Sequence, residues 1–92
     1  MPDYQDIISG IVTEEKQTIG DMAVKKANEV PSLTVDDDGN IEELDGNGEE
    51  ALGELVEKYE SMVGQAIGSV IRHQSKEGDL PELPPNVQKY VQ

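Results

Sequence analysis

The sequence contains no cysteine, no tryptophan and no phenylalanine, and it has only three tyrosines among its 92 residues. Without cysteine the chain forms no disulfide, and it offers no thiolate for catalysis or for binding zinc or an iron–sulfur cluster. Without large aromatic side chains, a core must be aliphatic, and Leu, Ile and Val together number 22. That share is above the one typical of disordered chains, so we expect one small folded domain.

Basic residues are also scarce, since seven Lys and Arg stand against 20 Asp and Glu and the net charge is −13. A chain this negative is repelled by nucleic acid and by anionic membrane surfaces, so neither is expected as a partner. The sequence has no apolar run that could span a bilayer and no basic-then-apolar signal at its N-terminus, and we expect a cytoplasmic protein. The charge predicts either a basic protein partner or adaptation to high salt, which screens self-repulsion.

Eight of the 20 acidic residues lie between positions 36 and 50. In this stretch, and in length and composition, the chain resembles small acidic proteins of haloarchaea. The resemblance implies a hydrated carboxylate surface that suits molar salt. One feature departs from the pattern, because Lys outnumbers Arg six to one and salt-adapted proteins usually avoid Lys. The segments that carry the resemblance are Val35-Asp36-Asp37-Asp38-Gly39-Asn40 and Glu42-Glu43-Leu44-Asp45-Gly46-Asn47-Gly48-Glu49-Glu50.

Apolar residues between positions 4 and 30 recur mostly three or four residues apart, which predicts a long amphipathic helix. Asp3 is placed to cap its start, and Pro31 disfavours helical geometry just before it, so the helix should end near residue 28 or 29. Glu15 falls on the apolar stripe and interrupts it. Gly10 and Gly20 weaken the prediction of one unbroken helix, since each glycine costs about 1 kcal/mol relative to alanine.

Residues 32–44 predict a β-hairpin with its turn at Asp37-Asp38-Gly39. A two-residue turn would set Val35 opposite Glu42, whereas a three-residue turn with Gly39 left-handed would set Val35 opposite Ile41. We prefer the second, because it keeps Val35, Ile41 and Leu33 on one face. A two-stranded hairpin is marginal alone, so it must lie on a helix or on a second hairpin.

The second helix has the clearest pattern, with Asn47 as its cap, a wide unbroken apolar stripe, and Gly78 as its stop signal. We assign residues 1–79 to a helix–hairpin–helix domain. Residues 80–92 form a Pro-rich C-terminal tail, docked or flexible, in which 86–91 could form one short helical turn.

Two helices of about 26 residues would each be roughly 39 Å long, and their hairpin would leave part of each apolar stripe uncovered. We therefore predict a mainly α fold, in which two long antiparallel helices joined by a β-hairpin assemble as a helical-bundle homodimer. Gly64 and Gly68 would let helix backbones approach closely, whether the partner is the first helix or a second copy. The predicted interface consists of Leu52, Leu55, Val56, Tyr59, Met62, Val63, Gly64, Ile67, Gly68 and Ile71.

The acidic loop matches an EF-hand calcium loop at several positions when Gly39 is set sixth. Thr34 then occupies the first position, where an acidic residue belongs, and an Asp replaces the usual bidentate Glu at the twelfth. We prefer a solvated acidic turn to a metal site. The candidate divalent-metal ligands are Asp36, Asp38, Asn40 and Asp45.

His73 is the only histidine, and Ser69 and Glu77 lie one helical turn to either side of it. A Ser-His-acid site also needs rigid converging elements and an oxyanion hole, for which the sequence shows no sign. We interpret His73 as part of a polar helix end, where it suits the helix dipole. No phosphate-binding glycine loop, HExxH or GxSxG motif occurs, so we expect no catalysis and no cofactor.

The resulting hypothesis is a non-enzymatic, homodimeric protein-interaction module adapted to high salt, with a further, unidentified protein partner. Two alternatives stay open. The helix–hairpin–helix order is similar to that of prefoldin subunits, which implies a holder of other proteins. The other alternative is a divalent-metal-binding protein that uses the acidic loop.

Overall fold

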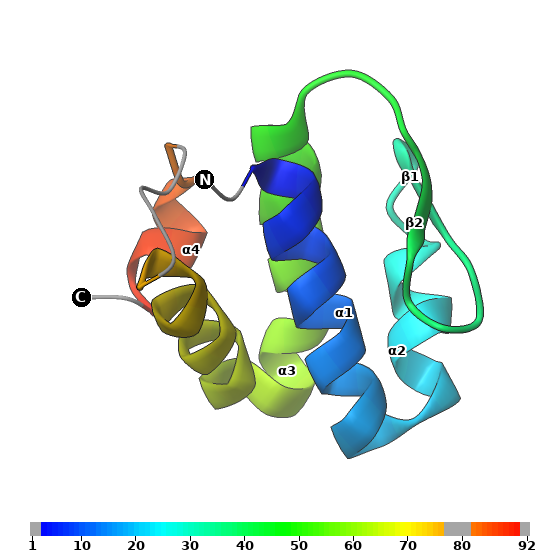
Figure 1. Ribbon diagram of the computed structural model, residues 1–92, viewed down its shortest axis with the longest axis horizontal. Helices are drawn as coiled ribbons and strands as arrows, with labels where there is room; N and C mark the ends of the chain where they lie inside the picture. Colours follow the sequence, from blue (N-terminus) through cyan, green and yellow to red (C-terminus); the bar gives the residue numbers. More distant parts are fainter. Residues whose placement is uncertain (1–2, 77–81, 91–92) are drawn as a thin grey trace.

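The structure is a computed structural model that describes residues 3–76 and 82–90, apart from the side chains of 60–66, 74 and 75. In chain order its elements are α1 (Tyr4–Ile19), α2 (Asp21–Ala27), β1 (Leu33–Val35), β2 (Ile41–Leu44), α3 (Gly48–Ser75) and α4 (Pro85–Gln88). Figure 1 shows α1 in the middle, with α2 and the hairpin on one side and the last turns of α3 with α4 on the other. The predicted mainly α class with a small antiparallel sheet is confirmed.

The first predicted helix is in fact two helices, so the prediction of a single long helix is wrong. α1 begins as predicted at Asp3, whose carboxylate accepts a 3.0 Å hydrogen bond from the backbone N–H of Asp6. Gly20 then adopts φ +68 and ψ −142, a conformation open to glycine but costly for other residues. The chain turns there, and α2 packs back against α1 until it ends at Ala27, next to the predicted end.

The second predicted helix forms, but it is bent. Asn47 caps it as expected, because its side-chain oxygen accepts a 2.8 Å hydrogen bond from the backbone N–H of Glu49. A straight helix of 28 residues would be about 42 Å long, whereas the longest extent of the molecule is 28 Å. Figure 1 shows the last turns of α3 leading away from α1 towards α4. The predicted pair of long antiparallel helices is therefore wrong, and the predicted stop at Gly78 lies outside the described residues.

The β-hairpin has the predicted register, with Val35 opposite Ile41 and Gly39 at φ +89 in the turn. It lies on the helices, as a two-stranded sheet must. The Asn28 side chain, at the end of α2, donates to the Val35 carbonyl at 3.2 Å and accepts from the Val35 N–H at 2.9 Å. The tip rests on α1, where a Cβ at Gly39 would lie 3.3 Å from Val12 Cγ1.

The described part of the C-terminal tail, residues 82–90, is docked on α3. Val87 is completely buried, and the Asn86 side chain donates to the Gly53 carbonyl at 2.9 Å. The Tyr4 hydroxyl donates to the Glu82 carbonyl at 2.6 Å and so joins the tail to the start of α1. The tail, α2 and the hairpin thus cover apolar surface that we expected a second copy to cover. Tail residues 80, 81, 91 and 92 lie outside the described residues.

Candidate functional site

Most of the predicted dimer interface lies in the core of a single chain. Among the described residues, Met22 alone is an exposed large apolar side chain, so these residues present no free apolar stripe for a second copy. The side chains of Met62 and Val63, and Gly64, lie outside the description. Gly68 is buried, and the following are 0% exposed: Leu52, Leu55, Val56, Tyr59, Ile67 and Ile71.

Gly68 is at a close contact, as its small size predicted, and the segment that it contacts within the chain is the tail rather than the first helix. A Cβ at Gly68 would lie 2.5 Å from the backbone oxygen of Tyr90 in the tail. The Arg72 guanidinium, one turn further along α3, donates to that same oxygen at 2.9 Å. The close contact at Gly68 was predicted correctly, but the predicted packing did not include the tail.

The candidate metal loop holds the hairpin turn together. The carboxylate of Asp36 accepts hydrogen bonds of 2.9 Å from the backbone N–H groups of Asp38 and Asn40. The bond from Asn40 is the main reason that the pKa of Asp36 is lowered. Asp45 lies past the other end of the hairpin, where its N–H bonds to the Ser32 carbonyl. In the part of the chain that the structure describes, no group of three or more His, Asp or Glu side chains is placed to hold a metal ion, so the four candidates do not converge.

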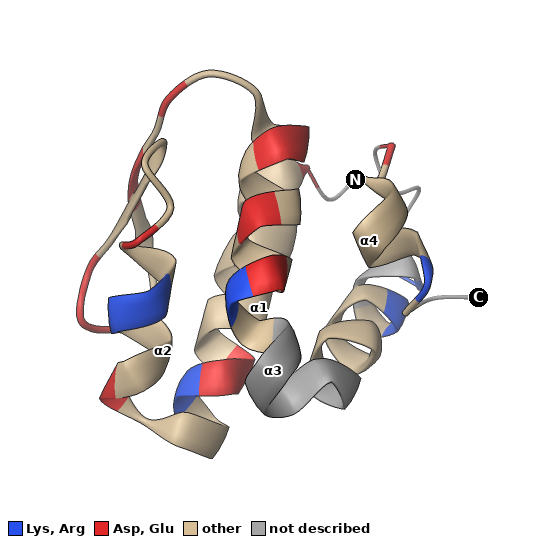
Figure 2. Ribbon diagram, turned by 180° about the vertical axis from the view of Figure 1, so that it is seen from behind, with Lys and Arg blue, Asp and Glu red and all other residues tan. Residues whose placement is uncertain are grey.

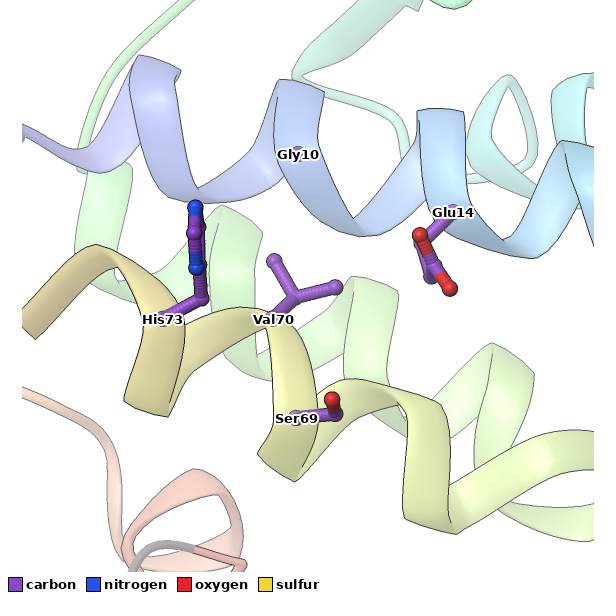
Figure 3. A pocket seen from close by; sticks show the side chains of 5 residues that line it. All are labelled: Gly10, Glu14, Ser69, Val70 and His73. Atoms are coloured by element: carbon purple, nitrogen blue, oxygen red, sulfur yellow. The ribbon is translucent and has the colours of Figure 1, made fainter.

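Ser69 and His73 line a hollow of about 380 Å³ between α1 and the last turns of α3. The structure adds Glu14 from α1, whereas Glu77 lies outside the described residues. In Figure 3 the imidazole of His73 points towards α1 beside Gly10, and the Ser69 hydroxyl lies on the other side of Val70. The three polar groups share a groove, but this placement is not the hydrogen-bonded chain of nucleophile, base and acid that a triad requires.

Four exposed carboxylates line two adjoining hollows beside the first turns of α3. The hollows, of about 200 and 360 Å³, share Glu50 and Glu54, and they extend to the loop before α3 on one side and to Asn86 on the other. No described Lys or Arg forms an ion pair with these carboxylates, and Lys58 instead lies 3.6 Å from Glu29. Figure 2 shows the acidic bands on these turns. We call this surface the acidic face; it consists of Asp45, Glu50, Glu54 and Glu57.

The acidic face was not among the sites predicted from the sequence. The spacing of positions 50, 54 and 57 would have placed their side chains on one side of the helix. The position of Asp45 beside them depends on how the loop returns to α3, which spacing does not predict.

The most unusual ionisable group is Glu15, on α1. It is 0% exposed, and among the described residues neither of its carboxylate oxygens has a hydrogen-bond partner. Burial, and then the charge of Glu14, raises the pKa of Glu15 to about 7. The pKa of Tyr59 is also raised, by burial and then by the charge of Glu15, which places the two side chains close together.

Tyr59 also reaches α2. Its hydroxyl donates to the Ala23 carbonyl at 2.5 Å. Neither the effect of Glu15 on Tyr59 nor this hydrogen bond could be predicted from the spacing of residues along one helix.

No described helix is both long enough and apolar enough to cross a membrane. No family model, curated protein or solved structure matches the chain.

Proposed function

We propose that this protein is a non-enzymatic interaction module that binds a positively charged segment of another protein on its acidic face. The observation that carries the proposal is the arrangement of four exposed carboxylates around two adjoining hollows, without a described basic side chain to neutralise them. A Lys or Arg side chain can lay its apolar stem in such a hollow while its charged end meets a carboxylate.

The distribution of apolar residues supports an electrostatic interaction. The aliphatic side chains of α1 and α3 are buried within the chain, and the described surface has little apolar area to offer. Charge complementarity mainly speeds association and selects the partner, so binding should weaken steeply as salt is added.

Adaptation to high salt is part of the same proposal. A net charge of −13 destabilises a compact chain by self-repulsion, and salt relieves that repulsion. The folded state should therefore gain stability in molar potassium chloride, while binding to a basic segment weakens. The two effects have opposite signs, so they can be measured separately.

The homodimer stays a prediction, and absolute molar mass by light scattering tests it. Its interface would have to lie on surface other than the core side chains of α3, or the chain would have to open and expose those side chains. The prefoldin-like alternative has lost its topological support, because the two long helices on which it rested are not present. The metal-binding alternative lacks converging ligands in the described part of the loop.

Binding of a labelled Lys- and Arg-rich peptide, followed by anisotropy at low salt, tests the acidic face. The test variant Glu50→Gln/Glu54→Gln/Glu57→Gln removes three charges from it, and Asp37→Asn/Glu42→Gln/Glu43→Gln removes three exposed charges elsewhere. We expect the first to weaken binding roughly tenfold and the second to have a much smaller effect. Equal losses would mean that net charge alone attracts the peptide, which contradicts a specific face.

A further inference from the structure

Glu15 occupies a position that suits an uncharged side chain. It lies on the buried side of α1 with residues such as Val12, and both carboxylate oxygens are sealed from solvent without a described donor. An ionised carboxylate in such a place is unfavourable unless it is paired and hydrogen-bonded, so it stays protonated or the surrounding structure opens to water.

Among the described residues, no positive charge compensates the Glu15 carboxylate, whose pKa is shifted by burial and by Glu14. On α1 itself, Glu14 is a like charge, and the Lys16 ammonium bonds the Asp37 carbonyl and lies 4.0 Å from Asp38 on the hairpin. Among the described side chains of α3, the group that the charge of Glu15 affects is Tyr59, whose hydroxyl donates to the Ala23 carbonyl.

The charged side chains of α2 are either exposed to solvent or paired with another residue. Asp21 and Lys25 are exposed, and Lys26 lies 3.7 Å from Glu29. Burial and Glu14 together hold the pKa of Glu15 near 7, well above the ordinary 4.5 of a glutamate.

The segment from α2 to the end of β2, residues 21–44, packs on α1 and α3 and is bonded through the Ala23 carbonyl to Tyr59, the group whose pKa the charge of Glu15 raises. It is joined to α1 through Gly20, whose positive φ makes a sharp joint. α2 buries only small side chains, those of Ala23, Val24 and Ala27, and a two-stranded hairpin is marginal alone. The rest of the segment adds the buried side chains of Val30, Leu33 and Val35. A unit made of one short helix and a two-stranded hairpin can open at a lower free energy than the whole domain unfolds.

We propose that Glu15 is a pH-sensitive latch: when its carboxyl is protonated, residues 21–44 stay packed on α1 and α3, and when it ionises they swing out on the joints at Gly20 and Gly46, which connect the segment to α1 and to α3. The Tyr59–Ala23 hydrogen bond is the contact that breaks first. Opening admits water to the carboxylate and exposes the apolar faces of α1 and of the hairpin. Glu15 itself is not part of the acidic face, but Pro31 and Ser32 of the moving segment line one of the two hollows, so opening also alters that hollow.

Amide hydrogen exchange of the full chain, resolved by peptide and corrected for intrinsic rates, tests the latch between about pH 5 and about pH 8. In the natural sequence, protection of residues 21–44 should fall at least about tenfold as pH rises, while α1 and the first turns of α3 keep theirs. Glu15→Gln cannot ionise, so it should stay protected at both pH values. Glu14→Gln is the matched control, and it should keep the transition and move it to lower pH.

Two outcomes would overturn the proposal. If Glu15→Gln loses protection with pH as the natural sequence does, another group drives the opening. If protection falls equally in α1, α3 and residues 21–44, ionisation unfolds the whole chain and no latch exists. Should Glu15→Gln fail to fold, Glu15→Leu provides a second side chain that cannot ionise and matches the apolar surroundings.

Discussion

Gly68 in α3 and Tyr90 in the tail are so close that a Cβ on the glycine would lie 2.5 Å from the tyrosine's backbone oxygen. Alanine normally stabilises a helix by about 1 kcal/mol relative to glycine. At this position the added methyl group meets backbone that must move, and overpacking of this kind costs about 1–3 kcal/mol. We therefore expect Gly68→Ala to lower the free energy of unfolding, measured in urea.

Gly53 provides the matched control on the same helix. A Cβ there would lie 3.4 Å from Pro84, which is near ordinary contact distance. We expect Gly53→Ala to be neutral or to stabilise the protein by up to about 1 kcal/mol. If Gly68→Ala is as stable as Gly53→Ala, the tail does not pack on α3 at Gly68 in solution.

Asn28 joins α2 to the hairpin, because its amide bonds both backbone groups of Val35. Asn28→Ala removes the donor and the acceptor and leaves the partly covered backbone groups of Val35 without these partners. We expect a loss of about 1–2 kcal/mol in the free energy of unfolding. Its neighbour Glu29 is exposed and forms only surface ion pairs with Lys26 and Lys58, so Glu29→Ala should cost less than about 1 kcal/mol. Equal losses in the two variants would show that the hydrogen bonds between Asn28 and Val35 add nothing to the free energy of unfolding.

Local chemistry explains why several elements could be predicted from the sequence. The caps at Asp3 and Asn47 depend on residues within three positions, and so does the left-handed turn at Gly39. The hairpin register followed from placing Val35 and Ile41 on the same face.

The errors have a common physical cause, which is packing between distant segments. The cost of a glycine in a helix was foreseen at Gly10 and Gly20 alike, but α1 continues through Gly10 and the chain turns only at Gly20, where its direction depends on how α2 packs on α1. The tail covers Gly53 and Gly68 through contacts that no periodicity reveals. Likewise, spacing put Ser69 and His73 on one helix face, whereas Glu14 reaches their groove from another helix.

Asp36 stabilises the hairpin turn by accepting two backbone hydrogen bonds, so its role should be independent of calcium. We expect Asp36→Ala to lower the Tm by a few degrees, equally in the presence of calcium and of a chelator. Asp38→Ala, which removes an exposed carboxylate of the same loop, should have a smaller effect. A rise in Tm with calcium that Asp36→Ala abolishes would instead favour the metal-binding alternative.

The hydrogen bonds to Asp36 also predict the sign of its pH dependence. Because they lower the pKa of this carboxyl below its ordinary 3.8, they stabilise the folded state to the full extent only where Asp36 is ionised in both states. That stability is present above the ordinary pKa and is lost as pH falls through the lowered pKa. Acid unfolding of Asp36→Asn should therefore be shallower at the lowest pH values than that of the natural sequence.

Glu15 should produce the opposite dependence at higher pH. Its pKa is raised from 4.5 to about 7, so between these values the folded state holds a proton that the unfolded state releases. The stabilising effect is complete below about pH 4.5 and is lost as pH rises to about 7, a change of up to about 3 kcal/mol. Surface carboxylates also repel one another more as pH rises, so the measurement is the difference in the free energy of unfolding between the natural sequence and Glu15→Gln. That difference should widen in favour of Glu15→Gln across this range and stay constant above it. A difference that does not change with pH would mean that Glu15 is ionised and solvated in the folded protein, in contradiction to its burial.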